Sequence, residues 1–205
     1  LTQSIVIDCV NDCDAVVTIN SITEVACNGD ATGSATVLAT SSSNIGGPFD
    51  FVWTQSGVTI FTSSGVSSTL TAAPAGVYVV SVSIQGTSCL PVEQSVTIGQ
   101  PQFELVANAV TIQNQLTVGG SEGSVTASGA GGTAPYTYQW DAAAGSATSQ
   151  TVSSLAPGTY CVVVSDANGC SSTQACTIVN PVTCVSSPFI GFNVTNVTCN
   201  GQSNG

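Results

Sequence analysis

The sequence predicts an all-β chain made of two tandem β-sandwich modules stapled by disulfides. Short runs rich in Val, Ile, Thr and aromatic residues recur roughly every 8–12 residues between Gly, Ser and Asn turns. The chain also repeats itself, and nine of its 205 residues are cysteines. No stretch of useful length follows the 3.6-residue period of a helix. A sandwich is the fold class that these three observations favour.

Two alternating runs predict the main strands of the first module. Residues 49–53 (FDFVW) place an aromatic side chain at every second position. Residues 77–84 (VYVVSVSI) alternate with the same period, so the side chains of the even-numbered residues share one face. We expect both runs to be strands that turn this face toward the core.

The second module repeats these strands with small deletions. TAPYTYQW at 133–140 matches GGPFDFVW at 46–53 with an offset of 87. Further on, LAPGTYCVVVS at 155–165 matches APAGVYVVSVS at 73–83 with an offset of 82. The falling offset indicates that loop residues are missing from the second copy between the two matches.

Four aromatic residues are the predicted core anchors: Trp53, Trp140, Tyr78 and Tyr160. A tryptophan on the third strand and a tyrosine near a later corner are typical buried positions in sandwiches. Exposure of Trp53 or Trp140 as a platform for stacking carbohydrate is the alternative.

The repeats also set the domain boundaries. Each unit ends in Ile-x-x-Pro, at 98–101 and 178–181, and VTCNGQSNG at 197–205 matches VACNGDATG at 25–33. The predicted organisation has four parts: the end of a preceding repeat at 1–14, a first sandwich at 15–100, a second sandwich at 101–181, and a linker with the start of the next repeat at 182–205.

A hairpin at 166–170 (DANGC) predicts one disulfide. Asn168–Gly169 supplies the two positive-φ positions of a type I′ turn. In a hairpin closed on this pair, two residues lie opposite each other when their numbers add to 337. Cys161 then faces Cys176. A bridge between them would close about 16 residues and contribute roughly 3 kcal/mol.

The other cysteines are paired by their position in the repeats. Val118 stands where the second copy should carry the counterpart of Cys27, so Cys170 has to pair with a cysteine beyond the module. The predicted pairings are Cys27 with Cys89, Cys170 with Cys184, and Cys9 either with Cys13 or with the preceding repeat. Disulfides of this number are typical of extracellular proteins.

The charge composition excludes several functions. Lys, Arg and His are absent, and eleven carboxylates give a formal net charge of −11. Nucleic-acid binding and electrostatic anchoring to anionic lipid both need basic residues, so we expect neither nucleic-acid partners nor membrane insertion. The carboxylates are scattered singly, and no His or Lys could activate a nucleophile, so we expect no enzyme activity.

Calcium is the metal hypothesis that the sequence raises. Asp12, Asp14, Glu24 and Asp30 lie near one predicted module boundary and offer hard oxygen ligands. A solvated acidic linker is the favoured alternative, because no EF-hand-like spacing is present. No other cofactor is expected.

Several motifs together resemble known surface-protein repeats. Gly-x-Tyr-x-Val-x-Val after an aromatic-x-aromatic-x-Trp strand resembles the PKD-like branch of immunoglobulin-type sandwiches. CNGDATG at 27–33, together with DANGC at 166–170, resembles the SprB-type repeats of the large adhesins of gliding Bacteroidota. The resemblance covers about residues 15–205. Two departures concern the cysteines: the second copy lacks its opening Cys, and the first carries IQGTSC at 84–89 in place of DANGC.

The resemblance implies tandem Ig-like, PKD-like modules in a secreted cell-surface fibre. The function it implies is structural: a repeat segment that spaces and stiffens an adhesin stalk for surface attachment or gliding. Neighbouring repeats of the same chain are then its partners, and a surface or polysaccharide is its ligand. Two alternatives stay open: a subunit of a self-assembling filament of identical chains, and a carbohydrate-binding module.

Overall fold

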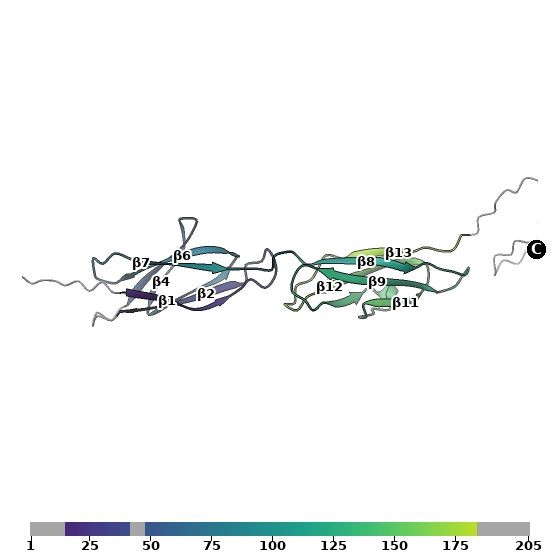
Figure 1. Cartoon of the computed structure of the whole chain (residues 1–205), viewed down its shortest axis with the longest axis horizontal. Helices are drawn as coiled ribbons and strands as arrows, with labels where there is room; N and C mark the ends of the chain where they lie inside the picture. Colours follow the sequence, from purple (N-terminus) through teal and green to yellow (C-terminus); the bar gives the residue numbers. More distant parts are fainter. Residues whose placement is uncertain (1–14, 42–47, 184–205) are drawn as a thin grey trace, which may run out of the picture. The chain divides into compact units, whose positions relative to one another are not determined.

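The computed structural model describes residues 15–41 and 48–183, and the chain divides into two compact units between Gln100 and Pro101 (Figure 1). Within the described residues, all regular structure is β-strand apart from one short 3-10 turn. The predicted all-β class is therefore confirmed. No described helix has the length and apolar character that crossing a membrane requires.

The first module is a sandwich of two antiparallel sheets. Its described strands are β1 (Ala15–Thr23), β2 (Gly33–Ser41), β3 (Phe49–Gln55), β4 (Val58–Gly65), β5 (Ser67–Ala73), β6 (Gly76–Ile84) and β7 (Val92–Ile98). One sheet has the order β1-β2-β5 and the other β4-β3-β6-β7. Three strands facing four in this order make an immunoglobulin-type sandwich.

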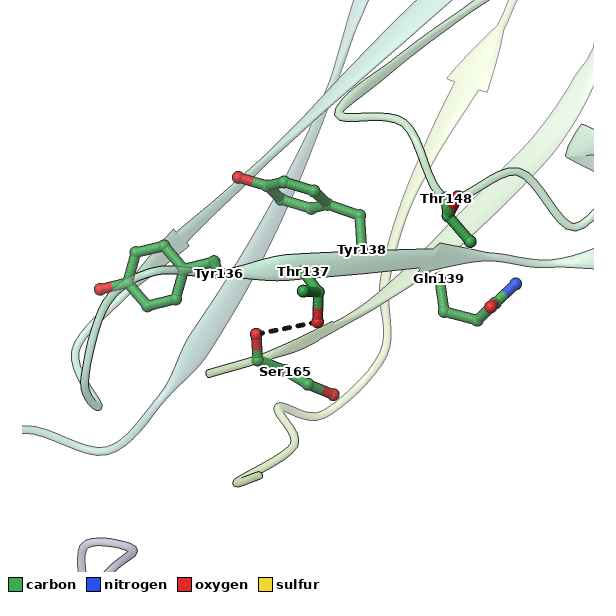
Figure 2. Close-up of a pocket in the computed structure, with 6 residues that line it drawn as sticks. All are labelled: Tyr136, Thr137, Tyr138, Gln139, Thr148 and Ser165. Carbon is green, nitrogen blue, oxygen red and sulfur yellow. Dashed lines mark hydrogen bonds between the residues drawn. The ribbon is translucent and has the colours of Figure 1, made fainter. Parts of the chain in front are cut away.

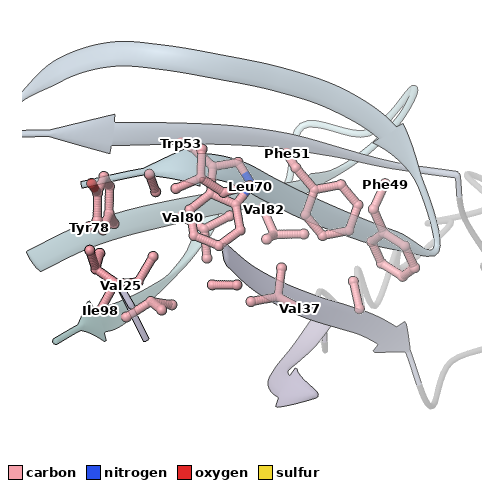
Figure 3. Close-up of a cluster of buried hydrophobic side chains, with 14 of the residues drawn as sticks. Val25, Val37, Phe49, Phe51, Trp53, Leu70, Tyr78, Val80, Val82 and Ile98 are labelled. Carbon is pink, nitrogen blue, oxygen red and sulfur yellow. The ribbon is translucent and has the colours of Figure 1, made fainter. Parts of the chain in front are cut away.

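A core of buried side chains fills the space between these sheets (Figure 3). Phe49, Phe51 and Trp53 project inward from β3, because alternate residues of a strand share one face. Tyr78 lies in the same core on β6. Trp53 is 0% exposed, and its Nε1 donates a hydrogen bond of 2.9 Å to Ser68 Oγ. Because Trp53 is buried, it cannot serve as an exposed platform for stacking carbohydrate.

The second module keeps this plan with one strand fewer in its described residues. Its elements are β8 (Val106–Gln113), β9 (Gly123–Ala130), β10 (Thr137–Trp140), the 3-10 turn η1 (Ala142–Ala144), β11 (Thr151–Leu155), β12 (Gly158–Ser165) and β13 (Ala175–Val179). The sheets have the orders β11-β9-β8 and β10-β12-β13. Trp140 and Tyr160 are buried in a core cluster of this module.

The missing strand is the counterpart of β4. In the first module β4 follows β3, whereas η1 and an irregular segment follow β10. Asp141 caps η1 by accepting the N–H of Ala144, and the Trp140 N–H donates to the Ala147 carbonyl at 2.9 Å. The sequence offset falls from 87 to 82 across this segment. This segment of the second copy is therefore five residues shorter, and it forms a 3-10 turn and irregular chain where the first module has an edge strand.

The closing strands align differently from the sequence match of Ile98 with Ile178. Gly76 pairs with Ile98 and its counterpart Gly158 pairs with Val179, so Val179 takes the place of Ile98. A shift of one residue exchanges the two faces of a strand. Ile98 and Val179 are 1% and 0% exposed, whereas Ile178 is 56% exposed.

Each core tyrosine also closes a corner of its module. The Tyr78 hydroxyl donates to the Pro74 carbonyl, and the Tyr160 hydroxyl to the Ala156 carbonyl, both at 2.6 Å. This bond to backbone four residues upstream is the tyrosine corner of Ig-type sandwiches. The corner fixes the chain where it enters β6 or β12.

Replacing Tyr160 with phenylalanine is expected to lower the free energy of unfolding of the second module by about 1 kcal/mol, since it removes one partly buried hydrogen bond. Chemical denaturation would measure the loss. Tyr138→Phe is the matched control, because the half-exposed Tyr138 forms no such corner, and its effect should stay below about 0.5 kcal/mol. Equal losses in both variants would contradict the role given to the corner.

Candidate functional site

One disulfide links the two strands of the last hairpin of the second module. Cys161 and Cys176 face each other across β12 and β13, with Cα atoms 4.0 Å apart and their sulfurs bonded. This pairing has the register that adds to 337. Neither cysteine lies in the core, so the bridge joins the two strands on their outer face.

The turn of this hairpin differs from the predicted type I′ turn. Gly169 has a φ of 82°, but Asn168 does not adopt a positive φ. The Gly169 N–H donates to the Asp166 carbonyl, and the Asp166 N–H donates to the Cys170 carbonyl. The loop therefore has three residues and ends in a glycine in the left-handed region, a common alternative to the two-residue turn.

Asp166 holds this loop against the start of β10. Its carboxylate is 6% exposed and accepts the backbone N–H groups of Thr133, Asn168 and Cys170 at 2.8 to 2.9 Å. Burial by itself raises the pKa of Asp166, but backbone N–H donors, including that of Gly169, outweigh burial and lower the pKa. The aspartate of DANGC is thus a structural acceptor for two segments of backbone, its own loop and the one around Thr133.

Asp166→Asn is expected to destabilise the second module by about 1–3 kcal/mol at pH 7, because an amide replaces the charged acceptor of buried N–H groups. The folded-state pKa lies below the unfolded value of about 3.9, so this contribution is present above that pH and is lost as pH falls through the folded pKa. Urea midpoints between pH 2 and 7 should therefore converge for wild type and variant at low pH. A constant gap across that range would contradict this account, and the exposed Glu104→Gln serves as control.

The first module secures the corresponding loop by a different carboxylate. Asp50 on β3 accepts hydrogen bonds from Ser64 Oγ and Gln85 Nε2, both at 2.6 Å. The bond from Ser64, followed by that from Gln85, lowers the pKa of Asp50. Gln85 belongs to IQGTSC, the segment that replaces DANGC. A carboxylate therefore holds the loop after β6 to β3 in the first module, and the loop after β12 to the segment before β10 in the second.

The predicted Cys27–Cys89 bridge does not fit the structure. Val25, two residues before Cys27, donates its N–H to Gly99 at the end of β7, whereas Cys89 lies in the loop that precedes β7. The seven residues of β7 separate the two positions by about 20 Å. A disulfide needs Cα atoms within about 6.8 Å. Cys27, Cys89 and Cys170 all take part in disulfides, and the positions of Cys27 and Cys89 at opposite ends of β7 separate those two.

The remaining predicted cysteine and calcium sites are only partly within the described residues. Cys9, Cys13 and Cys184 lie outside them, and so do Asp12 and Asp14. The pairings Cys170–Cys184 and Cys9–Cys13 stay predictions. Glu24 and Asp30 are exposed, and the described part of the chain holds no group of three or more Cys, Asp or Glu side chains that could bind a metal ion.

A hollow of about 590 Å³ lies along β10 (Figure 2). Its lining is uncharged and comes from Tyr136, Thr137, Tyr138, Gln139, Thr148 and Ser165. Tyr138 and Thr137 project to opposite sides of the strand, so the hollow follows the edge of β10. Hydroxyl, amide and aromatic groups line it, and no carboxylate is among them. No sequence motif marked this site, although the drop in repeat offset falls beside it.

The sequence of each module matches one family model. Residues 19–58 and 109–145 both match the SprB repeat. Each module therefore contains a segment that matches the SprB repeat. The first match runs from β1 to the start of β4, and the second runs from β8 through η1. The resemblance to SprB-type repeats is thereby confirmed: CNGDATG lies within the first match, whereas DANGC lies outside both. The two matches cover corresponding strands of both sandwiches.

Several solved structures are similar to this chain at low sequence identity. The three N-terminal domains of the bacteriophage RB49 Highly Immunogenic Outer Capsid protein (Hoc) match at 20% identity and a TM-score of 0.47, over 80% of this chain and 58% of that one. A C-terminal 282-residue fragment of intimin, solved with an intimin-binding domain of its receptor, matches at 16% identity and 0.35, over 80% and 64%. Fibronectin(III)-like modules of Clostridium thermocellum CbhA match at 13% and 0.33, over 80% and 94%.

The chain spans less than two thirds of the Hoc and intimin fragments. The search of curated proteins found no matching sequence.

Proposed function

We propose that this chain is a structural segment of a secreted cell-surface adhesin, in which SprB modules space and stiffen a stalk for attachment or gliding. The observation that carries the proposal is repetition: two sandwiches of the same plan, each with an SprB repeat, follow one another in one chain. SprB-type repeats are those of surface adhesins. The disulfides fit an oxidising, extracellular location.

The described carboxylates support an architectural role. The pKa values of Asp50, Glu122 and Asp166 are lowered, and in each case local hydrogen bonds hold the charged form. For Glu122 the Thr117 hydroxyl is the main cause, followed by the Leu116 N–H among the backbone donors. A general acid would need a raised pKa instead. These three side chains therefore hold nearby loop segments in place.

Electron microscopy of the native assembly tests the proposal. Antibodies against this segment should label intact cells along thin surface fibres, and the mass per unit length should equal that of one chain. Labelling only after permeabilisation would overturn the surface location. Two or more chains in cross-section would favour the alternative, a self-assembling filament of identical chains.

A further inference from the structure

The second module has an open sheet edge where the first module has a strand. In the first module β3 pairs with β6 on one side and β4 on the other. Its counterpart β10 pairs with β12 on one side, and no described strand lies on the other. The uncharged hollow of Figure 2 lies along β10, and its lining includes Ser165 of β12 as well as Thr148 from the segment after η1. The place of the absent strand is the edge of β10 that faces away from β12.

The backbone of Tyr138 points into this open side. Val164, opposite Tyr138, directs both its backbone groups to Ser172: its N–H donates to Ser172 Oγ, and its carbonyl accepts the Ser172 N–H. Tyr138 and Val164 are therefore a pair without mutual hydrogen bonds, and the N–H and C=O of Tyr138 face away from β12. At Trp140 the same side is occupied, since its N–H donates to Ala147. The open stretch centres on Tyr138.

The strand best suited to this edge is β4. It forms the outer edge of its sheet and contains neither a charged residue nor proline (VTIFTSSG). Val58, Ile60 and Phe61 are exposed by 65%, 45% and 38%. Edge strands of soluble proteins are usually protected by charge, proline or bulges that deter pairing. β4 combines exposed apolar side chains with an uncharged sequence. Its register against β3 shifts by one residue at Ile60, and the stretch from Phe61 to Gly65 is regular.

We propose that β10 of one copy of this chain accepts β4 of a second copy as an added antiparallel strand. The first module shows that this sheet position accommodates such a strand, because β3 and β10 share the aromatic-x-aromatic-x-Trp pattern and β3 carries β4. The contact is heterologous: each copy uses two different edges, so association continues into a chain or a closed ring. The contact is one that the alternative named above, a self-assembling filament of identical chains, would use, and it is tested separately from the stalk.

Charge makes this association depend on salt. Each copy carries a formal charge of −11, so copies repel one another, while neither β4 nor the lining of the hollow contains a charged side chain. Added salt screens the repulsion over about 8 Å at 0.15 M and leaves the uncharged contact intact. Association should therefore strengthen as salt rises, opposite to a contact held by ion pairs.

Sedimentation velocity of the full chain tests the proposal with variants on each edge. Thr137→Glu and Gln139→Glu each place a charge beside the hollow, and Ile60→Glu places one on β4; all three side chains are exposed. Thr173→Glu, an exposed threonine in the loop before β13, is the matched control. Wild type and the control should form concentration-dependent oligomers larger than dimers. Each edge variant alone should lose them while keeping its thermal unfolding transition.

A mixture of Thr137→Glu and Ile60→Glu distinguishes the proposed contact from others. Only one intact β4 and one intact β10 then remain able to meet, so an equimolar mixture should stop at dimers. Folded edge variants that assemble like wild type would overturn the proposal. So would a wild-type chain that remains monomeric at about 100 µM in 0.5 M salt, or a mixture that restores longer assemblies.

Discussion

Trp53→Ala is expected to remove about 3–5 kcal/mol from the stability of the first module. Its side chain is fully buried between the sheets, so truncation leaves a large cavity among side chains that relax only in part. The buried Ser68 hydroxyl also loses the indole N–H and keeps only Ser63 as a partner. Since domains are stable by about 5–15 kcal/mol, this one change removes much of the total.

Calorimetry of the full chain would measure this loss module by module. Trp53 and Trp140 belong to separate buried clusters. Trp53→Ala should therefore lower one unfolding transition and Trp140→Ala the other. Trp140 donates its indole N–H to the Ser149 carbonyl at 3.0 Å, so the second variant loses an equivalent bond. Two transitions that shift together in either variant would contradict the assignment of one core to each module.

The buried core could be predicted because half-buried strands alternate in sequence as they do in space. Phe49, Phe51 and Trp53 are all buried, as the alternation of FDFVW requires. Their counterparts show the limit of the argument: Tyr136 and Tyr138 follow the same pattern but are only half-buried. The pattern gives the face of a strand, whereas the depth of burial depends on neighbouring strands, and β10 has lost one.

The register of Cys161 and Cys176 was predicted from a turn that does not exist. The three-residue loop places Asp166 opposite Cys170, in a register that adds to 336. An additional residue before β13 then restores the register of 337 at the cysteines. Two departures from the predicted hairpin cancel, and sequence alone offers no signal for either.

Positions fixed by contacts distant in sequence were less predictable. The sequence match aligned Val118 with Cys27, whereas the hydrogen bonds align Thr117 with Cys27. The Thr117 carbonyl accepts the N–H of Gly120, three residues later, just as the Cys27 carbonyl accepts the N–H of Asp30. A loop of this kind has no alternating pattern of apolar and polar residues. An alignment that is wrong by one residue therefore leaves no sign in the sequence. The predicted Cys27–Cys89 pairing failed for a related reason. Both cysteines belong to the first module, but that alone does not tell at which end of β7 each of them lies.

Removing the Cys161–Cys176 disulfide is expected to lower the stability of the second module by about 3 kcal/mol, because the loop it closes no longer restricts the unfolded chain. The double variant Cys161→Ala/Cys176→Ala tests this without reducing the other disulfides. Denaturant midpoints of the two modules would measure the loss, and the first module should not respond. An unchanged second module would show that its unfolded state is restricted by something else.

The same pair of cysteines makes a mechanical prediction that does not depend on stability. When a module is pulled apart, residues between two bridged cysteines cannot extend. The sequence separation of Cys161 and Cys176 is 15, and extended chain spans at most about 3.3–3.6 Å per residue. Because Cys170, inside this loop, also takes part in a disulfide, both chains compared carry Cys170→Ala. Stretching them between their ends in single-molecule force spectroscopy should then give a step for the second module that is longer by about 50 Å when Cys161 and Cys176 are also replaced by alanine. The step of the first module is the internal reference and should be unchanged. Equal steps with and without the Cys161–Cys176 bridge would mean that the bridge does not limit the extension of the second module. A stalk under load would then lengthen by the residues that the bridge should hold together.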